Sequence, residues 1–423
     1  MRTYRELFRT PEFLPLFATA SVQVAAQTAS GLALGTLVYA STGSPLLSAL
    51  AMFGPSLAQV AGAFTLLSAA DRLPPRATLT GLALLYALGT GVQAVPGLPL
   101  WAAFAVLLAL GVASSLGGGV RYGLLNEILP QRGFLIGRSV LNMSVGTMQI
   151  LGFAVGGVLV TTLSARGTLL VGAGLYVVAA ALARFGLTAR PPRATGRASV
   201  RETWRTNALL WSSAPRRSVY LALWVPNGLV VGCESLYIAY APEHAGLLFA
   251  CGALGMLAGD TLVGRFVPGR WRARLGAPLR LLLAAPYLLF ALDPGVPVAV
   301  VAVVLASVGF SASLLLQERL MALTPEELSG HALGLSSSGT LAMQGVGAAV
   351  AGTIAQLTSP GTAMAAVAAL SLAVTVTLAP GLRAGRGQEA AGRLQGDGSP
   401  DGTPVGSPDA SPRTKETKET TTS

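Results

Sequence analysis

One acidic side chain stands inside a long apolar stretch, where its chemistry would be proton exchange or cation binding. Glu234 lies in the apolar run 218–241. An ionisable group inside a membrane span costs at least about 2.5–3.5 kcal/mol, so it is a functional candidate by default. Trp224, Asn227 and Tyr237 share its helical face at i+3 and i+7 spacing. We interpret this face as a contact for an organic cation or a coupling proton. The alternative is a glutamate that reaches water at the outer interface.

A second charged residue, Arg121, follows three glycines at the inner end of the run 98–120. It could contact an anion or pair with an acid of a gate, and an anchor at the inner membrane interface is equally consistent. Neutral polar residues also gather on common helical faces, and they are Gln23, Gln27, Asn142, Gln149 and Gln344. Each one alone is explained by interhelical hydrogen bonding, worth about 0.6 kcal/mol. As a set, they indicate the lining of a cavity.

Residue constellations of enzymes and metal sites are missing from the sequence. There is no Walker-type phosphate loop, nucleophile elbow or pair of carboxylates at catalytic spacing. Cys233 and Cys251 have no metal-ligand spacing with a histidine or with each other. We therefore expect no enzyme activity, no cofactor, no metal and an energy source other than ATP.

The composition predicts the elements that must position these side chains. Hydrophobic residues make up 52% of the chain and charged residues 11%, whereas a soluble domain carries about 25% charged residues. Apolar runs of about 20 residues recur, and each can cross a bilayer core of ~30 Å. We expect an all-α integral membrane protein with twelve transmembrane helices. They lie near 13–40, 45–70, 77–95, 98–120, 139–163, 167–188, 218–241, 245–264, 276–292, 296–316, 333–356 and 361–380.

The net charge of +11 is distributed asymmetrically. Almost all lysines and arginines fall in alternate connections, as expected of cytoplasmic loops. We therefore expect a multi-pass protein of the plasma (inner) membrane with both termini in the cytoplasm. A nucleic-acid partner is not expected, because aromatic and basic residues are not interleaved as in single-strand binders.

Fragments of the two halves match at an offset of about 195 residues. Met148-Gln149 and the residues up to Gly157 correspond to Met343-Gln344 and the residues up to Gly352. Such a duplication predicts two pseudo-symmetric six-helix bundles with a binding site between them. The expected segments are an N-terminal stub (1–12), a first bundle (13–188), a basic linker (189–217), a second bundle (218–380) and a disordered tail (381–423).

A charged loop follows the second span and recurs in the second half. Asp71, Arg72 and Arg76 form the first copy, and the second contains Asp260, Arg265 and Arg270. This loop resembles the cytoplasmic motif Gly-x-x-x-Asp-Arg-x-x-x-Arg of the major facilitator superfamily, with Leu67 in place of the leading glycine. The resemblance covers about residues 10–380, and it implies alternating access with these charges as a cytoplasmic gate.

The fifth span carries a second likeness to that family. Gly152, Gly156 and Gly157 match the Gly-Pro-x-x-Gly-Gly pattern of its antiporters, with Phe153 where the proline is expected. Gly347 and Gly352 are the counterparts in the repeat. Small residues at this spacing let helices approach closely, and close-packed helices are what a rocking motion slides along.

These observations predict a secondary active transporter that exports a small amphipathic or cationic organic compound, with the proton as coupling ion and antiport as mechanism. Its partners are a small-molecule substrate and the lipid bilayer, and we expect a monomer. Two alternatives stay open. One is uptake or uniport of a sugar, organic acid or siderophore-like molecule, and the other is a transport-inactive membrane sensor of a ligand.

Overall fold

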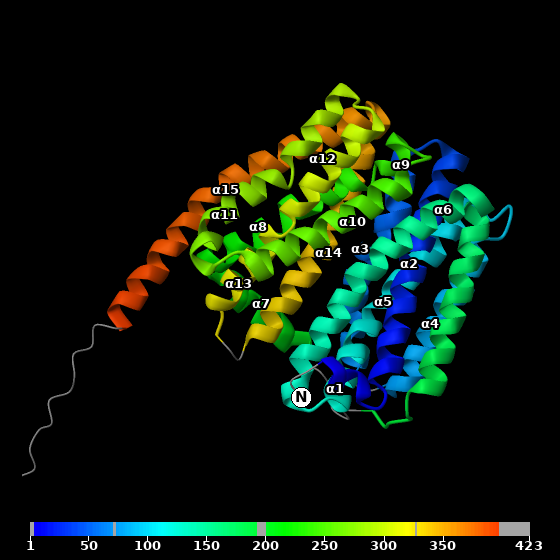
Figure 1. The fold of residues 1–423 in the computed structure, drawn as a ribbon, viewed down its shortest axis with the longest axis horizontal. Coiled ribbons are helices and arrows are strands. Elements are labelled where there is room, and N and C mark those ends of the chain that lie inside the picture. Colours follow the sequence, from blue (N-terminus) through cyan, green and yellow to red (C-terminus); the bar gives the residue numbers. More distant parts are fainter. Residues whose placement is uncertain (1–3, 71–72, 193–199, 326–327, 397–423) are drawn as a thin grey trace, which may run out of the picture. The chain divides into compact units, whose positions relative to one another are not determined.

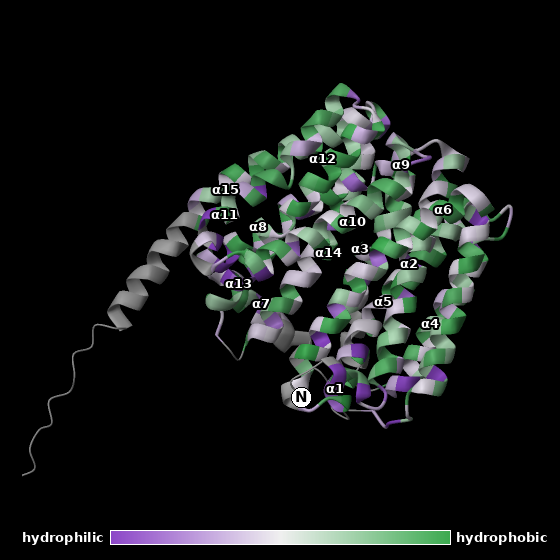
Figure 2. Ribbon diagram, viewed as in Figure 1, coloured by the Kyte–Doolittle hydropathy of each residue, from purple (hydrophilic) through white to green (hydrophobic). Residues whose placement is uncertain are grey.

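The structure is a computed structural model that describes residues 4–70, 73–192, 200–325 and 328–396. Within these ranges the chain forms helices joined by short connections, and they contain no strand. Nine of the described helices are long and apolar enough to cross a membrane. Figure 2 shows apolar residues along most of their length, with hydrophilic residues gathered around α1 (Tyr4–Arg9) and in the region of α13 (Ala312–Ala322). The architecture is that of an all-helical membrane protein.

The first half of the chain contains five further helices (Figure 1). They are α2 (Phe13–Thr42), α3 (Pro45–Ala70), α4 (Pro75–Gln93), α5 (Leu100–Ile128) and α6 (Gln131–Gly186). The long α6 is broken at Ser164, whose φ of 81° lies in the left-handed region. Its apolar stretch of 51 residues is about twice what one crossing needs. The break separates the two spans predicted at 139–163 and 167–188.

The second half contains more and shorter segments. They are α7 (Val200–Ser212), α8 (Ala214–Glu234), α9 (Tyr237–Tyr240), α10 (Ala245–Thr261), the π-helical η1 (Leu262–Phe266), α11 (Gly269–Leu282), the 3-10 segment η2 (Ala285–Leu292), α12 (Val296–Gly309), α13, α14 (Ser329–Leu357) and α15 (Pro360–Gly396). Several predicted spans are therefore interrupted. One break has a clear cause, because Pro286 supplies no amide hydrogen and its ring excludes the carbonyl that an α-helix needs there.

The helix boundaries agree with most of the predicted spans. The span predicted at 45–70 is α3, and the one at 333–356 lies within α14. Two differences stand out. α2 and α4 are not among the nine candidates for crossing a membrane. α15 continues to Gly396, beyond the predicted end of the last span near residue 380.

Close helix contacts inside each half rest on small residues. Gly156 lies against the backbone of Ala29 in α2, where an added Cβ would be 2.9 Å from the Cα of Ala29. A Cβ added at Gly152 would overlap the side chain of Thr28 in α2. In the second half, a Cβ added at Gly347 of α14 would overlap the backbone of Gly228 in α8. These positions permit backbone-to-backbone packing, as the glycine spacing predicts.

The two halves touch mainly along two helix pairs, α3 with α14 and α6 with α10, and α9 adds smaller contacts with α2 and α3. At the second pair, a Cβ added at Gly246 would lie 2.5 Å from the Cα of Gly157. At the first pair, Gly352 packs on the backbone of Leu46. Ser44 also donates a hydrogen bond of 2.8 Å to the Oε1 atom of Gln356. The halves therefore meet most closely at the end where α2 finishes and α10 begins.

Substitution at Gly246 should disturb this contact between the halves. We expect Gly246→Val to destabilise the protein by about 1–3 kcal/mol, because the new side chain has no room against α6. Gly174→Val is the matched control, since an added Cβ at Gly174 meets nothing within 4 Å. Thermal unfolding in detergent measures both variants. Equal melting temperatures would contradict the prediction.

Candidate functional site

The carboxylate of Glu234 is buried at the last residue of α8. Its side chain is 7% exposed, and the Oε1 atom has no hydrogen-bond partner among the described residues. The helix stops here, and the Ser235 hydroxyl donates a hydrogen bond of 2.7 Å to the carbonyl of Gly232. Next to the glutamate, the Cys233 thiol lies 3.3 Å from the carbonyl of Met364. One carboxylate oxygen of the acid is thus buried without a hydrogen-bond partner among the described residues.

Two buried tyrosines lie within electrostatic range of this acid. Tyr237 begins α9 and is 1% exposed, and Tyr287 of η2 is fully buried. Their hydroxyl groups form a short hydrogen bond with each other. The sequence predicted a role for Tyr237 but missed Tyr287. The available signal was a tyrosine inside an apolar run, because a buried hydroxyl needs a partner.

A row of three rings in contact connects this cluster to the first half of the chain. Phe249 of α10 packs edge-on against Tyr237, with ring centroids 4.9 Å apart. Phe249 also stacks on Phe153 of α6, with ring centroids 4.8 Å apart and an interplanar angle of 18°. Phe153 is the residue that stands where the antiporter pattern has proline. A change in the contact between α6 and α10 would therefore move a ring that touches Tyr237.

Trp224 and Asn227 lie on α8 but farther from the acid. Trp224 precedes Glu234 by about 15 Å of helix, stacks on Trp211 at 5.4 Å and donates a hydrogen bond to the Ser336 carbonyl at 3.0 Å. The Asn227 Oδ1 atom is buried and has no hydrogen-bond partner within the described ranges. The structure thus joins Tyr237 to Glu234, while Trp224 belongs to the packing of α7, α8 and α14.

Arg121 of α5 turns towards α2. One of its guanidinium nitrogens donates a hydrogen bond of 3.2 Å to Gln23 Oε1, and the residue is half-buried. The neighbouring Tyr122 donates a hydrogen bond of 3.0 Å to Asn142 Oδ1. The guanidinium of Arg138 lies over the Tyr122 ring at 5.5 Å. Gln23, Arg121 and Asn142 therefore belong to one polar region in the first half.

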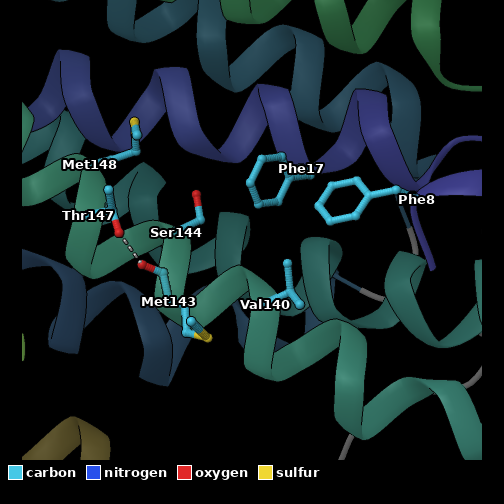
Figure 3. Close-up of a pocket in the computed structure, with 7 residues that line it drawn as sticks. All are labelled: Phe8, Phe17, Val140, Met143, Ser144, Thr147 and Met148. Atoms are coloured by element: carbon cyan, nitrogen blue, oxygen red, sulfur yellow. Dashed lines mark hydrogen bonds between the residues drawn. The ribbon is translucent and has the colours of Figure 1, made fainter. Parts of the chain in front are cut away.

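The remaining glutamines of the polar faces stay apart from this region. Gln27 on α2 and Gln149 on α6 are exposed, and Gln344 on α14 is half-buried. A cavity of about 370 Å³ opens between α1, α2 and the first part of α6 (Figure 3). Its lining is mostly apolar, and it consists of Phe8, Phe17, Val140, Met143, Ser144, Thr147 and Met148. None of the predicted polar residues lines it.

The predicted gate residues are only partly within the described ranges, since Asp71 and Arg72 lie outside them. Arg76 is half-buried in the first turn of α4, while Asp260 and Arg265 are exposed and form no ion pair with each other. Arg270 lies in the first turn of α11. Arg272, which was not among the predicted gate residues, holds this loop in place. It donates a hydrogen bond of 3.0 Å to the Gly264 carbonyl and lies 3.6 Å from Glu318.

The tyrosine pair beside Glu234 gives a test of this geometry. We expect Tyr237→Phe and Tyr287→Phe each to destabilise the protein by about 1–3 kcal/mol, because each leaves a buried hydroxyl without a partner. The double variant should recover most of that loss. Melting temperatures in detergent measure the effect. Tyr122→Phe is the control, since its hydrogen bond is exposed. Additive losses in the double variant would refute the hydroxyl pair.

Comparison with solved structures places the fold among membrane transporters. A POT-family transporter in complex with 5-aminolevulinic acid is 11% identical, with a TM-score of 0.69 over 86% of this chain and 95% of the other. The nucleoside transporter NupG is 13% identical, with a TM-score of 0.68 over 88% and 99%. A bacterial homologue of the human lysosomal transporter Spinster, inward-facing and unoccupied, is 14% identical, with a TM-score of 0.64 over 90% and 93%.

Sequence comparison identifies the family directly. No curated protein matches the chain. The family model of the Major Facilitator Superfamily matches residues 16–316, which is more than half of the sequence. This agrees with the charged loop after α3, with the glycines of α6 and with the helical membrane fold. The chain belongs to the Major Facilitator Superfamily.

Proposed function

We propose that this protein exports a small amphipathic or cationic organic compound across the plasma membrane in exchange for protons. The observation that carries the proposal is the buried carboxylate of Glu234, which has no hydrogen-bond partner for Oε1 among the described residues. An acid kept at membrane depth without a partner is costly unless it binds something during the working cycle. A proton and an organic cation are both species that such a group binds.

The arrangement of rings around the acid supports a cation as its second ligand. Tyr237 and Tyr287 lie within electrostatic range of Glu234, and Phe249 packs edge-on against Tyr237. Aromatic faces attract organic cations most strongly where water is excluded. Transport of small organic molecules also fits the solved relatives, one of which binds 5-aminolevulinic acid while another is a nucleoside transporter.

Alternating access between two six-helix bundles is the mechanism that we propose. The break at Ser164 divides α6 into two crossings, which supports a total of twelve. We take 13–188 and 218–380 as the bundles and both termini as cytoplasmic. The closest contacts between the halves then lie at the outer end, where Gly157 meets Gly246 and Ser44 meets Gln356. In this interpretation the protein is closed towards the outside.

The row of rings supplies a link between rocking and binding. Separation of α6 from α10 at the outer end would part Phe153 from Phe249, and Phe249 touches Tyr237. Opening towards the outside would therefore loosen the ring that packs on Tyr237. Exchange of a proton for a cation would follow as the site becomes accessible from the other side.

Accumulation of cationic dyes in cells tests export. Cells that produce the protein should hold less dye than cells with an empty vector, and a protonophore should remove the difference. Rhodamine 6G and ethidium are suitable probes, because both are permanently cationic and fluorescent. Equal accumulation with and without the protein for every dye of the panel would reject export of cationic compounds.

Neutralising the buried acid gives the sharper prediction. We expect Glu234→Gln to bring dye accumulation to the empty-vector level, because the amide can neither bind nor release a proton. Glu243→Gln is the matched control in the exposed connection before α10, and it should export like the unchanged protein. The melting temperature verifies that both variants fold. Coupled export that persists in Glu234→Gln would exclude this residue as the coupling site.

A further inference from the structure

We propose that Arg121, together with Gln23, binds a carboxylate or another oxyanion of the transported compound, which is therefore amphoteric. The inference rests on the proposed function in assuming that the protein moves a small organic compound that carries a cationic group. It adds a second charged group to that molecule. It also gives the first half of the chain a role in recognition, alongside Glu234 in the second half.

The charge of Arg121 is left largely unsatisfied by the protein. A guanidinium group carries five N–H donors in a fixed plane, suited to two parallel bonds with an oxyanion. Among the described residues, its side chain makes one hydrogen bond, to the neutral amide oxygen of Gln23, and no ion pair. A half-buried cation with free donors and no acid beside it is a ready contact for an anionic group.

The direction of the side chain excludes a simple membrane anchor. Arg121 lies about 10 Å from the end of α5 at Ile128, and Gln23 lies about 15 Å inside α2 from its start at Phe13. Phe13 and the last turns of α5 belong to one apolar cluster, and we take the two helix ends to lie at a similar depth. An arginine that reached for lipid headgroups would extend towards those ends. This one extends to α2, away from them.

Further polar side chains surround Tyr122, the residue that follows Arg121. Arg138 is exposed on α6 and lies over the ring of Tyr122, the neighbour of Arg121 in sequence. Asn142, one turn further along α6, is also exposed and accepts the Tyr122 hydrogen bond. The second cation adds positive potential next to the first, which would attract an anion and raise its local concentration.

The positions of the two candidate charges set the order of contact. Glu234 lies about 30 Å along α8 from its start at Ala214, whereas Arg121 is about 10 Å from the end of α5. With both termini in the cytoplasm, Arg121 is close to the inner side and Glu234 to the outer side. A compound that enters from the cytoplasm meets the arginine first with its acidic group.

A matched pair of dyes tests this assignment directly. Tetramethylrhodamine carries a delocalised cation and a free benzoate, and its methyl ester lacks only the negative charge. Binding of each dye to the purified full-length chain in phosphatidylcholine nanodiscs is measured by fluorescence polarisation at neutral pH. We expect the free carboxylate to bind at least about tenfold more tightly than the ester, because hydrogen bonds to charged groups discriminate by that amount or more.

Substitutions test whether Arg121 and Gln23 cause the preference for the carboxylate over the ester. Arg121→Gln should reduce the affinity for the carboxylate to that for the ester, with ester binding and melting temperature unchanged. Gln23→Glu should have a similar effect while keeping the arginine, because the new acid pairs with the guanidinium. Arg184→Gln is the control, since Arg184 is an exposed cation at the end of α6 that lies over Phe185. It should keep the full preference.

Three outcomes would overturn the proposal. They are the absence of any carboxylate binding, equal affinity for both dyes in the unchanged protein, and a preference that survives in both Arg121→Gln and Gln23→Glu. The assay uses no ion gradient, so its result is independent of whether transport is export and whether protons drive it. Protonophore-sensitive dye export with no carboxylate preference would preserve the proposed function and reject the anion site alone.

Discussion

Close approach of helix backbones is the constraint on which the rest of this structure depends. In a bilayer, helices gain nothing from hiding apolar surface from water, so association relies on tight packing. Glycine supplies that packing at Gly156 against Ala29 within the first half, and at Gly157 against Gly246 between the halves. A methyl group at these positions would separate the helices. The close contact between the halves thus depends on the absence of a side chain at Gly157 and Gly246.

The candidate site inherits its geometry from this contact. Because Gly157 and Gly246 let α6 and α10 touch, Phe153 comes within stacking distance of Phe249, and Phe249 in turn packs on Tyr237. The proline of the antiporter pattern has no ring that could stack in this way. The departure at Phe153 therefore gives this chain an aromatic contact between its halves that the family pattern does not contain.

Much of the helical layout could be predicted from the sequence, because length and hydropathy determine where a chain can cross a bilayer. The limits of α3 show this. The tertiary partners could not be predicted in the same way. Helical spacing predicted Trp224 on the same face as Glu234, but in the structure its ring stacks on Trp211. The hydrogen-bond partner of Tyr237 is Tyr287, which lies 50 residues away in the sequence. The twelve-span count and the gate at Asp71 stay predictions.

The end of α8 at Glu234 has an electrostatic consequence. The peptide dipoles of a helix add up to roughly half a negative charge at its C-terminal end, in the field of the last carbonyl groups. A cation that reaches Glu234 therefore meets the carboxylate and this partial charge together. Had the helix continued without interruption to Tyr240, the dipole would end about 9 Å further on. The turn at Ser235 and Leu236 thus places this negative potential at Glu234, the buried acid of the second half among the residues that the structure describes.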